Sequence, residues 1–553
     1  MIAADMCRLW ATHSAFDEKT QKEARAMLGD AEALAAAFGE ALSFGTAGLR
    51  GILGVGTARM NIYTVAHAAQ GMAGAIIEAG GGSAAVSYDS RRYSRRFAEV
   101  TAGVFAMAGI KCYLYNRLMP VPMLSFAVRA LGCDAGVMIT ASHNPAEYNG
   151  FKAYGPDGCQ MTDATAARVV AHMERTPYED VAWMDLEQAR ACELIDDVPG
   201  YVIEGYYAAT LARRVKNADA PSMRVVYSPL HGAGLEPVRE IVKRMRGRPL
   251  IEVSNQSEPD GNFPTCKMPN PEDPDALKLA IALAKAEDVE LVLATDPDCD
   301  RVGVATINPA GEVRVLSGNE IGLLLMEYLL SVGSPYPYVP LIVNTVVSSD
   351  LVFRIAEAYG AEVVSVLTGF KYIGEIIENL GERRDRFLLG FEESCGYLSG
   401  GQVRDKDAVL AVMLILDMAQ YHCGKGLSLS EALDALYARY GYWYNSTLDF
   451  KFDNVGEPDK QERIIEKLRR NPPNEMLGSA VTDIKDYAGG IEGLPPTNML
   501  SFESGLGDKA IVRPSGTEPK LKIYLSVKAV DAKSGWLKME ALKALASGWT
   551  VLD

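Results

Sequence analysis

Three times along the chain, short apolar segments alternate with amphipathic ones, and this alternation limits the possible folds more than any other feature. The three series occupy residues 83–140, 223–295 and 338–421. Their short apolar segments predict strands and their longer amphipathic segments predict helices. A strand–helix–strand order is typical of parallel sheets covered by helices. We therefore predict three consecutive α/β units with mixed, mostly parallel sheets, which repeat in topology but not at a fixed residue period.

The sequence from about residue 440 onwards has a different pattern. Residues 508–527, DKAIVRPSGTEPKLKIYLSV, predict two strands around a tight loop, and a closing helix follows at 537–549. This pattern indicates a C-terminal α+β domain. A chain of 553 residues is too long for one hydrophobic core. We expect four domains around a central cleft, with the boundaries 1–198, 199–312, 313–438 and 439–553.

A polar loop follows the last strand of each predicted α/β unit. These loops read TASHNP at 140–145, TDPDCDR at 295–301 and EESCGY at 392–397. Ligands of parallel sheets bind beyond the carboxyl ends of the strands. Because the three loops occupy equivalent places, we expect them to form three walls of one cleft.

The second loop contains three aspartates, Asp296, Asp298 and Asp300, at alternate positions after an apolar strand. Carboxylates this close repel one another unless a cation lies among them, and a hard divalent ion suits them best. A solvated acidic turn is the simpler alternative, but such turns seldom follow a buried strand. An EF-hand is excluded because Arg301 stands where it needs Gly and Ile307 where it needs Glu.

Ser142, in the first loop, is the candidate carrier of a covalent intermediate. No GxSxG motif surrounds it, and its sequence neighbour His143 is poorly placed as a general base, which argues against acyl transfer. An aspartyl phosphatase with Asp296 as nucleophile is another alternative, but it gives Ser142 no role. A serine that carries a phosphoryl group, whose oxygen completes the shell of Mg²⁺, accounts for both motifs.

The composition indicates which partners to expect. A net charge of −16 argues against nucleic acid, because such a partner needs a basic face. Nine cysteines without a CxxC pair suggest free thiols in a reducing cytoplasm. We see no signal peptide and no apolar run of the roughly 18 residues that a membrane span needs. We therefore expect a cytoplasmic protein with a small phosphorylated substrate and no membrane partner; the sequence does not determine the oligomeric state.

Four motifs in this order resemble the signature loops of the α-D-phosphohexomutases: TASHNPAEYNGFK (140–152), TDPDCDR, GFEESCGYL (390–398) and RPSGTEPKLK (513–522). Further segments resemble the phosphoglucomutase branch of the phosphoglucomutase/phosphomannomutase family, which also contains phosphopentomutases and sugar-bisphosphate synthases. They are FGTAGLRGILGVGTARMN (44–61), SPLHGAG (228–234), PDGNFPT (259–265) and TGFKYIGE (368–375). The resemblance extends from about residue 40 to the C-terminus.

The resemblance implies a role for each matching residue. Ser142 would be the phosphoserine and Lys152 the general base, with Arg50 and Arg301 lining the catalytic centre. The metal ligands would be Ser142, Asp296, Asp298 and Asp300, holding one Mg²⁺. The substrate-binding residues would be Glu392 and Ser394 for sugar hydroxyls, and Arg513, Ser515, Gly516 and Thr517 for the phosphate that does not react. A loop with glycine frees backbone N–H groups, and Arg513 can clamp phosphate through two bonds, which agrees with the last assignment.

The chain departs from the family at one motif. Dual phosphomanno/phosphoglucomutases carry GEMSGH, whereas this chain has EESCGY, so Gly396 and Tyr397 stand where the histidine would fall. Sugar preference therefore cannot be transferred from those enzymes.

Several other residues have two interpretations. Arg404 and Lys406 either reach the substrate phosphate or belong to a solvated loop that caps a helix. His231 either transfers a proton or is hydrogen-bonded to backbone. Asp89, Arg91 and Arg92 either line the cleft or form an ion network at a domain interface. We interpret Cys299 and Cys395 as small side chains that fill buried space.

We predict a mutase that interconverts sugar 1-phosphates and 6-phosphates, with glucose as the main sugar. Ser142 would donate its phosphoryl group to give glucose 1,6-bisphosphate and then recover the other phosphate. The alternatives are a phosphomannomutase, a phosphopentomutase, a sugar-bisphosphate synthase, or a catalytically silent sugar-phosphate-binding protein. The presence of Ser142, Lys152 and all three aspartates argues against the silent protein.

Overall fold

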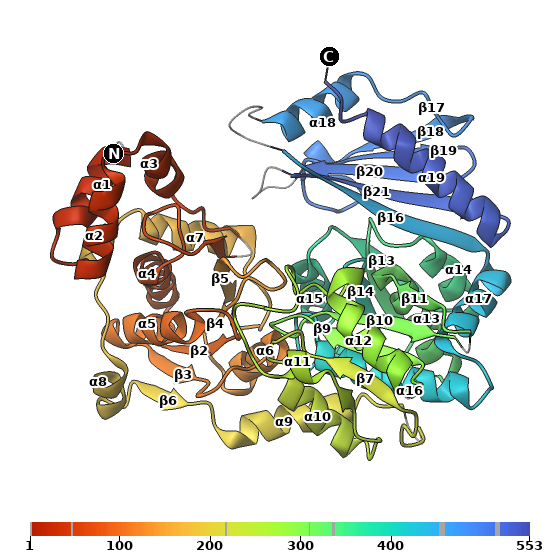
Figure 1. Cartoon of the computed structure of the whole chain (residues 1–553), viewed down its shortest axis with the longest axis horizontal. Helices are drawn as coiled ribbons and strands as arrows, with labels where there is room; N and C mark the ends of the chain where they lie inside the picture. The colour runs from red at the N-terminus through yellow and green to blue at the C-terminus, as the bar shows by residue number, and fades with distance from the viewer. Residues whose placement is uncertain are drawn as a thin grey trace.

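The computed structural model describes residues 3–45, 48–215, 218–308, 310–333, 338–452, 459–514 and 520–552. Three α/β units follow one another along the chain, and an antiparallel sheet domain completes the molecule (Figure 1). Within these ranges no helix is both long enough and apolar enough to cross a membrane.

The first sheet has the strand order β1-β5-β4-β2-β3-β6. Its strands are β1 (Leu49–Ile52), β2 (Ser83–Tyr88), β3 (Lys111–Leu114), β4 (Ala135–Ile139), β5 (Tyr148–Tyr154) and β6 (Ile195–Asp197). The helices are α1 (Ala3–Thr12), α2 (Glu18–Met27), α3 (Ala31–Phe38), α4 (Ile62–Glu78), α5 (Ser94–Met107), α6 (Val121–Ala130), α7 (Asp163–Met173) and α8 (Leu186–Ala191). Strands β2, β3 and β4 are parallel as predicted, whereas β5 runs antiparallel to β1 and β4.

The second sheet has the order β11-β10-β9-β7-β8. Its strands are β7 (Val225–Ser228), β8 (Ile251–Glu252), β9 (Leu291–Thr295), β10 (Val302–Ile307) and β11 (Val313–Leu316), and its helices are α9 (Gly200–Leu211), α10 (Leu235–Arg244), α11 (Ser254–Ser257) and α12 (Pro274–Ala286). Strands β9 and β10 form an antiparallel hairpin whose turn carries the aspartates. Strand β11 pairs with β10 and so extends this sheet beyond residue 312.

The third sheet has the order β13-β12-β14-β15. Its strands are β12 (Leu341–Thr345), β13 (Glu362–Val366), β14 (Phe387–Glu392) and β15 (Gly396–Leu398), and its helices are α13 (Gly318–Ser331), α14 (Leu351–Tyr359), α15 (Phe370–Asn379), α16 (Ala408–Cys423) and α17 (Leu429–Tyr440). Helix α16 is apolar on nearly all sides, and a helix of that kind must be buried. It packs against α10, β10 and α13, which makes the second and third units share one large core.

The fourth sheet is antiparallel, in the order β16-β21-β20-β19-β18-β17. Its strands are β16 (Tyr442–Lys451), β17 (Glu475–Met476), β18 (Ser479–Asp486), β19 (Leu500–Ser504), β20 (Lys509–Pro514) and β21 (Lys520–Ala529), and its helices are α18 (Lys460–Arg470) and α19 (Ala532–Gly548). Short 3-10 turns occur at Tyr178–Asp180, Gly381–Arg386 and Tyr487–Gly489. An ion pair of 2.6 Å between Lys509 and Asp350 joins this domain to the third unit.

Candidate active site

Ser142 lies in the turn that connects β4 to β5. Its backbone adopts the left-handed region, with φ of 51°, which is uncommon for a residue other than glycine. Its hydroxyl Oγ donates a hydrogen bond of 2.8 Å to Asp296 Oδ2, across the boundary between the first and second units. The Oγ atom also lies 3.2 Å from His143 Nδ1. The two neighbouring side chains are therefore in contact, which the sequence alone did not indicate.

The three aspartates converge in the turn between β9 and β10. Carboxylate oxygens of Asp296, Asp298 and Asp300 lie within 4.8 Å of one another, and all three side chains are buried. Burial, followed by the charges of the other two aspartates, raises the pKa of Asp296 well above its ordinary value. Oδ1 of Asp298 and Oδ1 of Asp300 have no hydrogen-bond donor among the described residues. Buried oxygens without donors are rare in proteins, and three hard oxygen ligands in this arrangement suit Mg²⁺.

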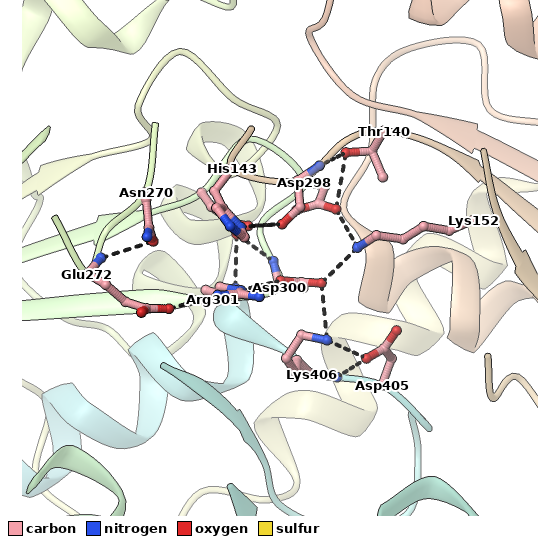
Figure 2. A network of polar contacts seen from close by, with 12 residues as sticks. Thr140, His143, Lys152, Asn270, Glu272, Asp298, Asp300, Arg301, Asp405 and Lys406 are labelled. Carbon is pink, nitrogen blue, oxygen red and sulfur yellow. Dashed lines mark hydrogen bonds and ion pairs between the residues drawn. The ribbon is translucent and has the colours of Figure 1, made fainter. Parts of the chain in front are cut away.

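Two lysines contact this cluster from the first and third units (Figure 2). Lys152 Nζ on β5 lies 2.8 Å from Asp298 Oδ2 and 3.0 Å from Asp300 Oδ2. Lys406 Nζ lies 3.3 Å from Asp300 Oδ2 and 2.9 Å from Asp405 Oδ1. Burial alone would lower the pKa of Lys152, but the adjacent carboxylates outweigh it and raise that pKa. Burial opposes ionisation of Asp300, yet the two ammonium groups hold the pKa of its carboxyl below the ordinary value.

Two arginines lie at the edge of the centre. Arg301 donates to Glu272 Oε1 at 2.7 Å, and its Nε lies 3.8 Å from Asp300 Oδ1. Arg50 on β1 is exposed and donates to Asn144 Oδ1 at 3.2 Å. Burial and the positive charges of Arg301 and Arg50 hold the pKa of His143 well below its ordinary value, so this imidazole is neutral near pH 7.

The third polar loop connects β14 to β15. Oε1 of Glu392 accepts a hydrogen bond of 2.8 Å from the Gly369 N–H, and the half-buried Ser394 follows two residues later. A Cβ atom added at Gly396 would lie 2.2 Å from Lys406 Cδ. Tyr397 is buried and donates to the Gly318 carbonyl at 3.1 Å. Lys406 therefore packs directly against Gly396, and the buried Tyr397 occupies the position of the histidine of the GEMSGH motif.

The fourth domain contributes Arg513 on β20, directly opposite Lys522 on β21. The other expected phosphate ligands, Ser515, Gly516 and Thr517, lie outside the described residues. An apolar cluster that contains Val347 and Ile511 packs this domain onto the third unit.

The remaining sequence candidates do not take part in the contacts among the aspartates and lysines. Arg404 is almost fully buried and pairs with Glu378 at 2.8 Å, so it does not reach the aspartates. His231 lies 3.2 Å from the Glu258 carbonyl and 2.9 Å from Thr265 Oγ1, which satisfies both ring nitrogens. Cys299 and Cys395 are buried thiols, and burial raises the pKa of each.

Sequence reasoning missed three residues of the centre. Thr140 Oγ1 donates to Asp298 Oδ2 at 3.1 Å and accepts the Ser142 N–H at 2.8 Å. Asp405 orients Lys406, and Glu272 orients Arg301. Thr140 begins the TASHNP loop, and Asp405 stands between the candidates Arg404 and Lys406. Their positions in the sequence could therefore have indicated a role in the site. Glu272 lies far from the loops in sequence and carried no such signal.

The fold and the site together define a class. A serine hydroxyl from one α/β unit meets a buried Asp cluster from a second unit and a lysine from a third, which is the arrangement of a phosphoryl-transfer centre. Family models described as phosphoglucomutase/phosphomannomutase α/β/α domains I, II and III match residues 41–180, 204–309 and 317–440. The chain therefore belongs to the phosphoglucomutase/phosphomannomutase family of the α-D-phosphohexomutase superfamily and is an isomerase.

Curated relatives and solved structures agree with this assignment. The chain is 35% identical over 503 residues to the phosphoglucomutase of Staphylococcus haemolyticus, covering 88% of this chain and 90% of the relative. It is 34% identical over 519 residues to that of Staphylococcus aureus strain N315, covering 91% and 93%. The fold matches a phosphoglucomutase/phosphomannomutase family protein from Burkholderia thailandensis, with TM-score 0.69, 18% identity and coverage of 92% and 97%. It also matches parafusin, a phosphoglucomutase from Paramecium, with TM-score 0.66, 17% identity and coverage of 92% and 95%.

Proposed function

We propose that the protein interconverts glucose 1-phosphate and glucose 6-phosphate through a phosphoserine at Ser142 and a glucose 1,6-bisphosphate intermediate. The observation that carries this proposal is the 2.8 Å contact of Ser142 Oγ with the buried Asp296, beside Lys152. The curated relatives named phosphoglucomutase support glucose as the sugar.

The residues around Ser142 have separate tasks in the transfer. The bond between phosphorus and Ser142 Oγ breaks while a bond forms to the oxygen of a sugar hydroxyl. The hydroxyl proton passes to Lys152, and Ser142 Oγ takes up a proton that it releases when it is phosphorylated again. The sugar then turns in the cleft, and the other phosphoryl group returns to Ser142 Oγ. We assign Arg301, His143 and Arg50 to the edge of this centre, where their donors can contact phosphoryl oxygens.

Mg²⁺ fits the oxygens that this centre presents. Ser142, Asp296, Asp298 and Asp300 would hold one ion, because Oδ1 of Asp298 and Oδ1 of Asp300 otherwise lack hydrogen-bond donors in the described structure. When bound, the ion neutralises charge on the transferring phosphoryl group. Asp298 and Asp300 hold Lys152 protonated, so it must lose this proton before it can act as a base. Another cation at those carboxylates would lower the pKa of Lys152 and favour that loss.

We assign substrate binding to residues of the third unit and the fourth domain. We assign Glu392 and Ser394 to sugar hydroxyls, because Glu392 ends β14 and Ser394 lies in the loop that follows, at the carboxyl end of that strand. Arg513, with Ser515, Gly516 and Thr517, is proposed to hold the phosphate that does not react. Lys406 would stabilise the charge near Asp300 rather than bind that distant phosphate.

We also propose that the enzyme works in the cytoplasm, with a small phosphorylated sugar as its partner. All nine cysteines lie in the described ranges and are free, which suits a reducing compartment. The four domains are proposed to follow the four sheets, with β11 in the second.

Mutase assays that detect the 6-phosphate or 5-phosphate product of each sugar test the proposal. The enzyme is supplied with Mg²⁺, a trace of glucose 1,6-bisphosphate and, separately, the 1-phosphates of glucose, mannose, ribose and deoxyribose. We expect the highest kcat/KM with glucose 1-phosphate. A higher value with a pentose 1-phosphate would make the protein a phosphopentomutase, and formation of bisphosphate without isomerisation would make it a sugar-bisphosphate synthase. If none of these sugar phosphates is turned over, the protein would instead be a catalytically silent sugar-phosphate-binding protein.

A further inference from the structure

Arg91, in the loop between β2 and α5, holds the segment that carries Ser142. Its side chain is buried, and its two terminal amino groups donate to main-chain carbonyls of that segment. Nη2 donates to the Ser142 carbonyl at 2.6 Å and to the Asn144 carbonyl, and Nη1 donates to the carbonyls of Pro145 at 2.9 Å and Tyr148 at 3.0 Å. One side chain thus fixes four peptide groups of the turn between β4 and β5.

The Ser142 backbone needs such support. Its φ of 51° lies in the left-handed region, so the turn keeps this geometry only while its surroundings hold it. The N–H of Ser142 donates to Thr140 Oγ1 at 2.8 Å, and the carbonyl of the same residue accepts from Arg91. Both peptide groups that flank the Cα atom are therefore fixed. A hydrogen bond from a charged donor is among the stronger polar contacts.

Arg91 is itself held from two directions. Within the first unit, its Nε lies 3.5 Å from Asp89 Oδ2, and Asp89 Oδ1 accepts hydrogen bonds from the Arg91 N–H at 2.9 Å and from Ser94 Oγ at 2.8 Å. From the second unit, the ring of Phe263 covers the guanidinium, with its centroid 4.9 Å from Arg91 Cζ.

The segment around Phe263 approaches the first unit very closely. Gly261 forms a parallel β-bridge with Arg91, and a Cβ atom added at Gly261 would lie 2.4 Å from the Arg92 N atom. The PDGNFPT motif at 259–265 therefore has a structural task, because it packs the second unit against the residue that holds the Ser142 turn. The unit that supplies Asp296 to Ser142 Oγ is also the unit that supplies this packing.

We propose that Arg91 is a positioning residue for phosphoryl transfer, which fixes the Ser142 turn so that Oγ meets the aspartates, and that Phe263 fixes Arg91 when the first two units are docked. The inference rests on the proposed function of Ser142. Arg91 touches no substrate in this account and acts only through the main chain. A displacement of about 1 Å at a reacting atom can lower the rate roughly 10²-fold. The hydrogen bonds by which Arg91 fixes this turn therefore matter for catalysis.

The test compares Arg91→Lys with Arg95→Lys as a matched control. Arg95 is exposed on α5, four residues along the chain, and pairs with Glu99 at 3.1 Å. A lysine cannot reproduce the planar fork that reaches four carbonyls, so we expect Arg91→Lys to lower kcat roughly 10²-fold while KM for glucose 1-phosphate stays within about threefold. Arg95→Lys should match the wild type in both.

Hydrogen exchange separates positioning from general support of the fold. In Arg91→Lys, amide exchange should rise at residues 142–148 while β4 keeps its wild-type protection. Exchange does not need turnover, so it tests the inference even if the wild type fails to isomerise any sugar phosphate, which would refute only the proposed function. Wild-type kcat in a folded Arg91→Lys, or exchange that rises equally across the first unit, would overturn the inference.

Phe263→Leu provides a second variant that leaves the carbonyl contacts of Arg91 in place. Loss of the cation–π contact is expected to lower kcat roughly fivefold, again with KM little changed. If Arg91→Lys does not fold, Phe263→Leu tests the proposal alone. Unchanged kcat together with unchanged amide exchange at residues 142–148 in Phe263→Leu would overturn the proposal.

Discussion

Replacement of Lys152 by Met tests the electrostatics of the centre most sharply, because Met keeps the bulk of the stem and removes only the ammonium group. Lys152 Nζ lies 2.8 Å and 3.0 Å from carboxylate oxygens of Asp298 and Asp300. At an effective dielectric constant of about 20, each contact has a Coulomb energy of about 6 kcal/mol. Desolvation of a buried ion costs several kcal/mol and offsets part of this, so removal of one partner is expected to destabilise the metal-free protein by about 3–5 kcal/mol.

Mg²⁺ should separate the contribution of Lys152 to stability from its contribution to proton transfer. A cation at the aspartates replaces the lost positive charge, so saturating Mg²⁺ should restore most of the free energy of unfolding. Turnover should not return, because the proton-transfer group is missing, and a loss of roughly 10² to 10⁴ in kcat is expected.

Urea unfolding of wild type and Lys152→Met, each in chelator and in Mg²⁺, measures the first effect, and the coupled mutase assay measures the second. Lys278→Met is the control, since Lys278 is exposed and forms an ion pair with the exposed Asp275. This substitution should change neither the free energy of unfolding nor kcat. Equal destabilisation of Lys152→Met with and without Mg²⁺, or turnover at the wild-type rate, would refute this reasoning.

Four further predictions concern the metal ligands, a buried carboxyl and the phosphate clamp. Asp298→Asn should lower kcat far more than it raises KM, which corresponds to a loss of several kcal/mol in activation free energy. Full activity of chelator-treated wild type would show that the metal assignment is wrong. Because burial and like charges raise the pKa of Asp296, Mg²⁺ must displace a proton at low pH. The calorimetric affinity for Mg²⁺ should therefore rise with pH, and a flat profile would contradict the assignment. Burial and the charge of Glu392 raise the pKa of Glu393 from 4.5 in the unfolded chain to about 7, so the native state loses stability as pH rises through 7. Glu393→Gln should accordingly have a higher Tm than wild type at pH 8 but not at pH 5, and equal differences at both would be inconsistent with a titrating carboxyl. Arg513→Ala should raise KM for glucose 1-phosphate and glucose 6-phosphate alike, and impairment in one direction only would exclude a single phosphate clamp.

Local patterns were enough to predict the metal-binding loop and the α/β units. The spacing of Asp296, Asp298 and Asp300 after an apolar strand is a property of the short continuous segment 291–300, so it is visible without a structure. The strands β2, β4 and β9 were likewise predicted from short apolar runs between amphipathic segments.

Contacts between distant segments could not be predicted in this way. The bond of Ser142 to Asp296 joins residues 154 positions apart and depends on how two units dock. The approach of His143 to Ser142 depends on one left-handed φ, which no pattern indicated. Strands β5 and β10 were missed because each returns antiparallel directly after a functional loop, where the strand–helix alternation is interrupted.

The central claim is that Ser142 carries the phosphoryl group, and its location can be measured directly. Dephosphorylated enzyme is incubated with ³²P-labelled glucose 1,6-bisphosphate and Mg²⁺, digested, and mapped by tandem mass spectrometry, with Ser142→Ala treated in parallel. The account predicts one acid-stable phosphate on the peptide that contains Ser142 and no label on the variant, which should also lack turnover. A hydroxylamine-sensitive label on Asp296, or near-normal turnover by Ser142→Ala, would contradict it.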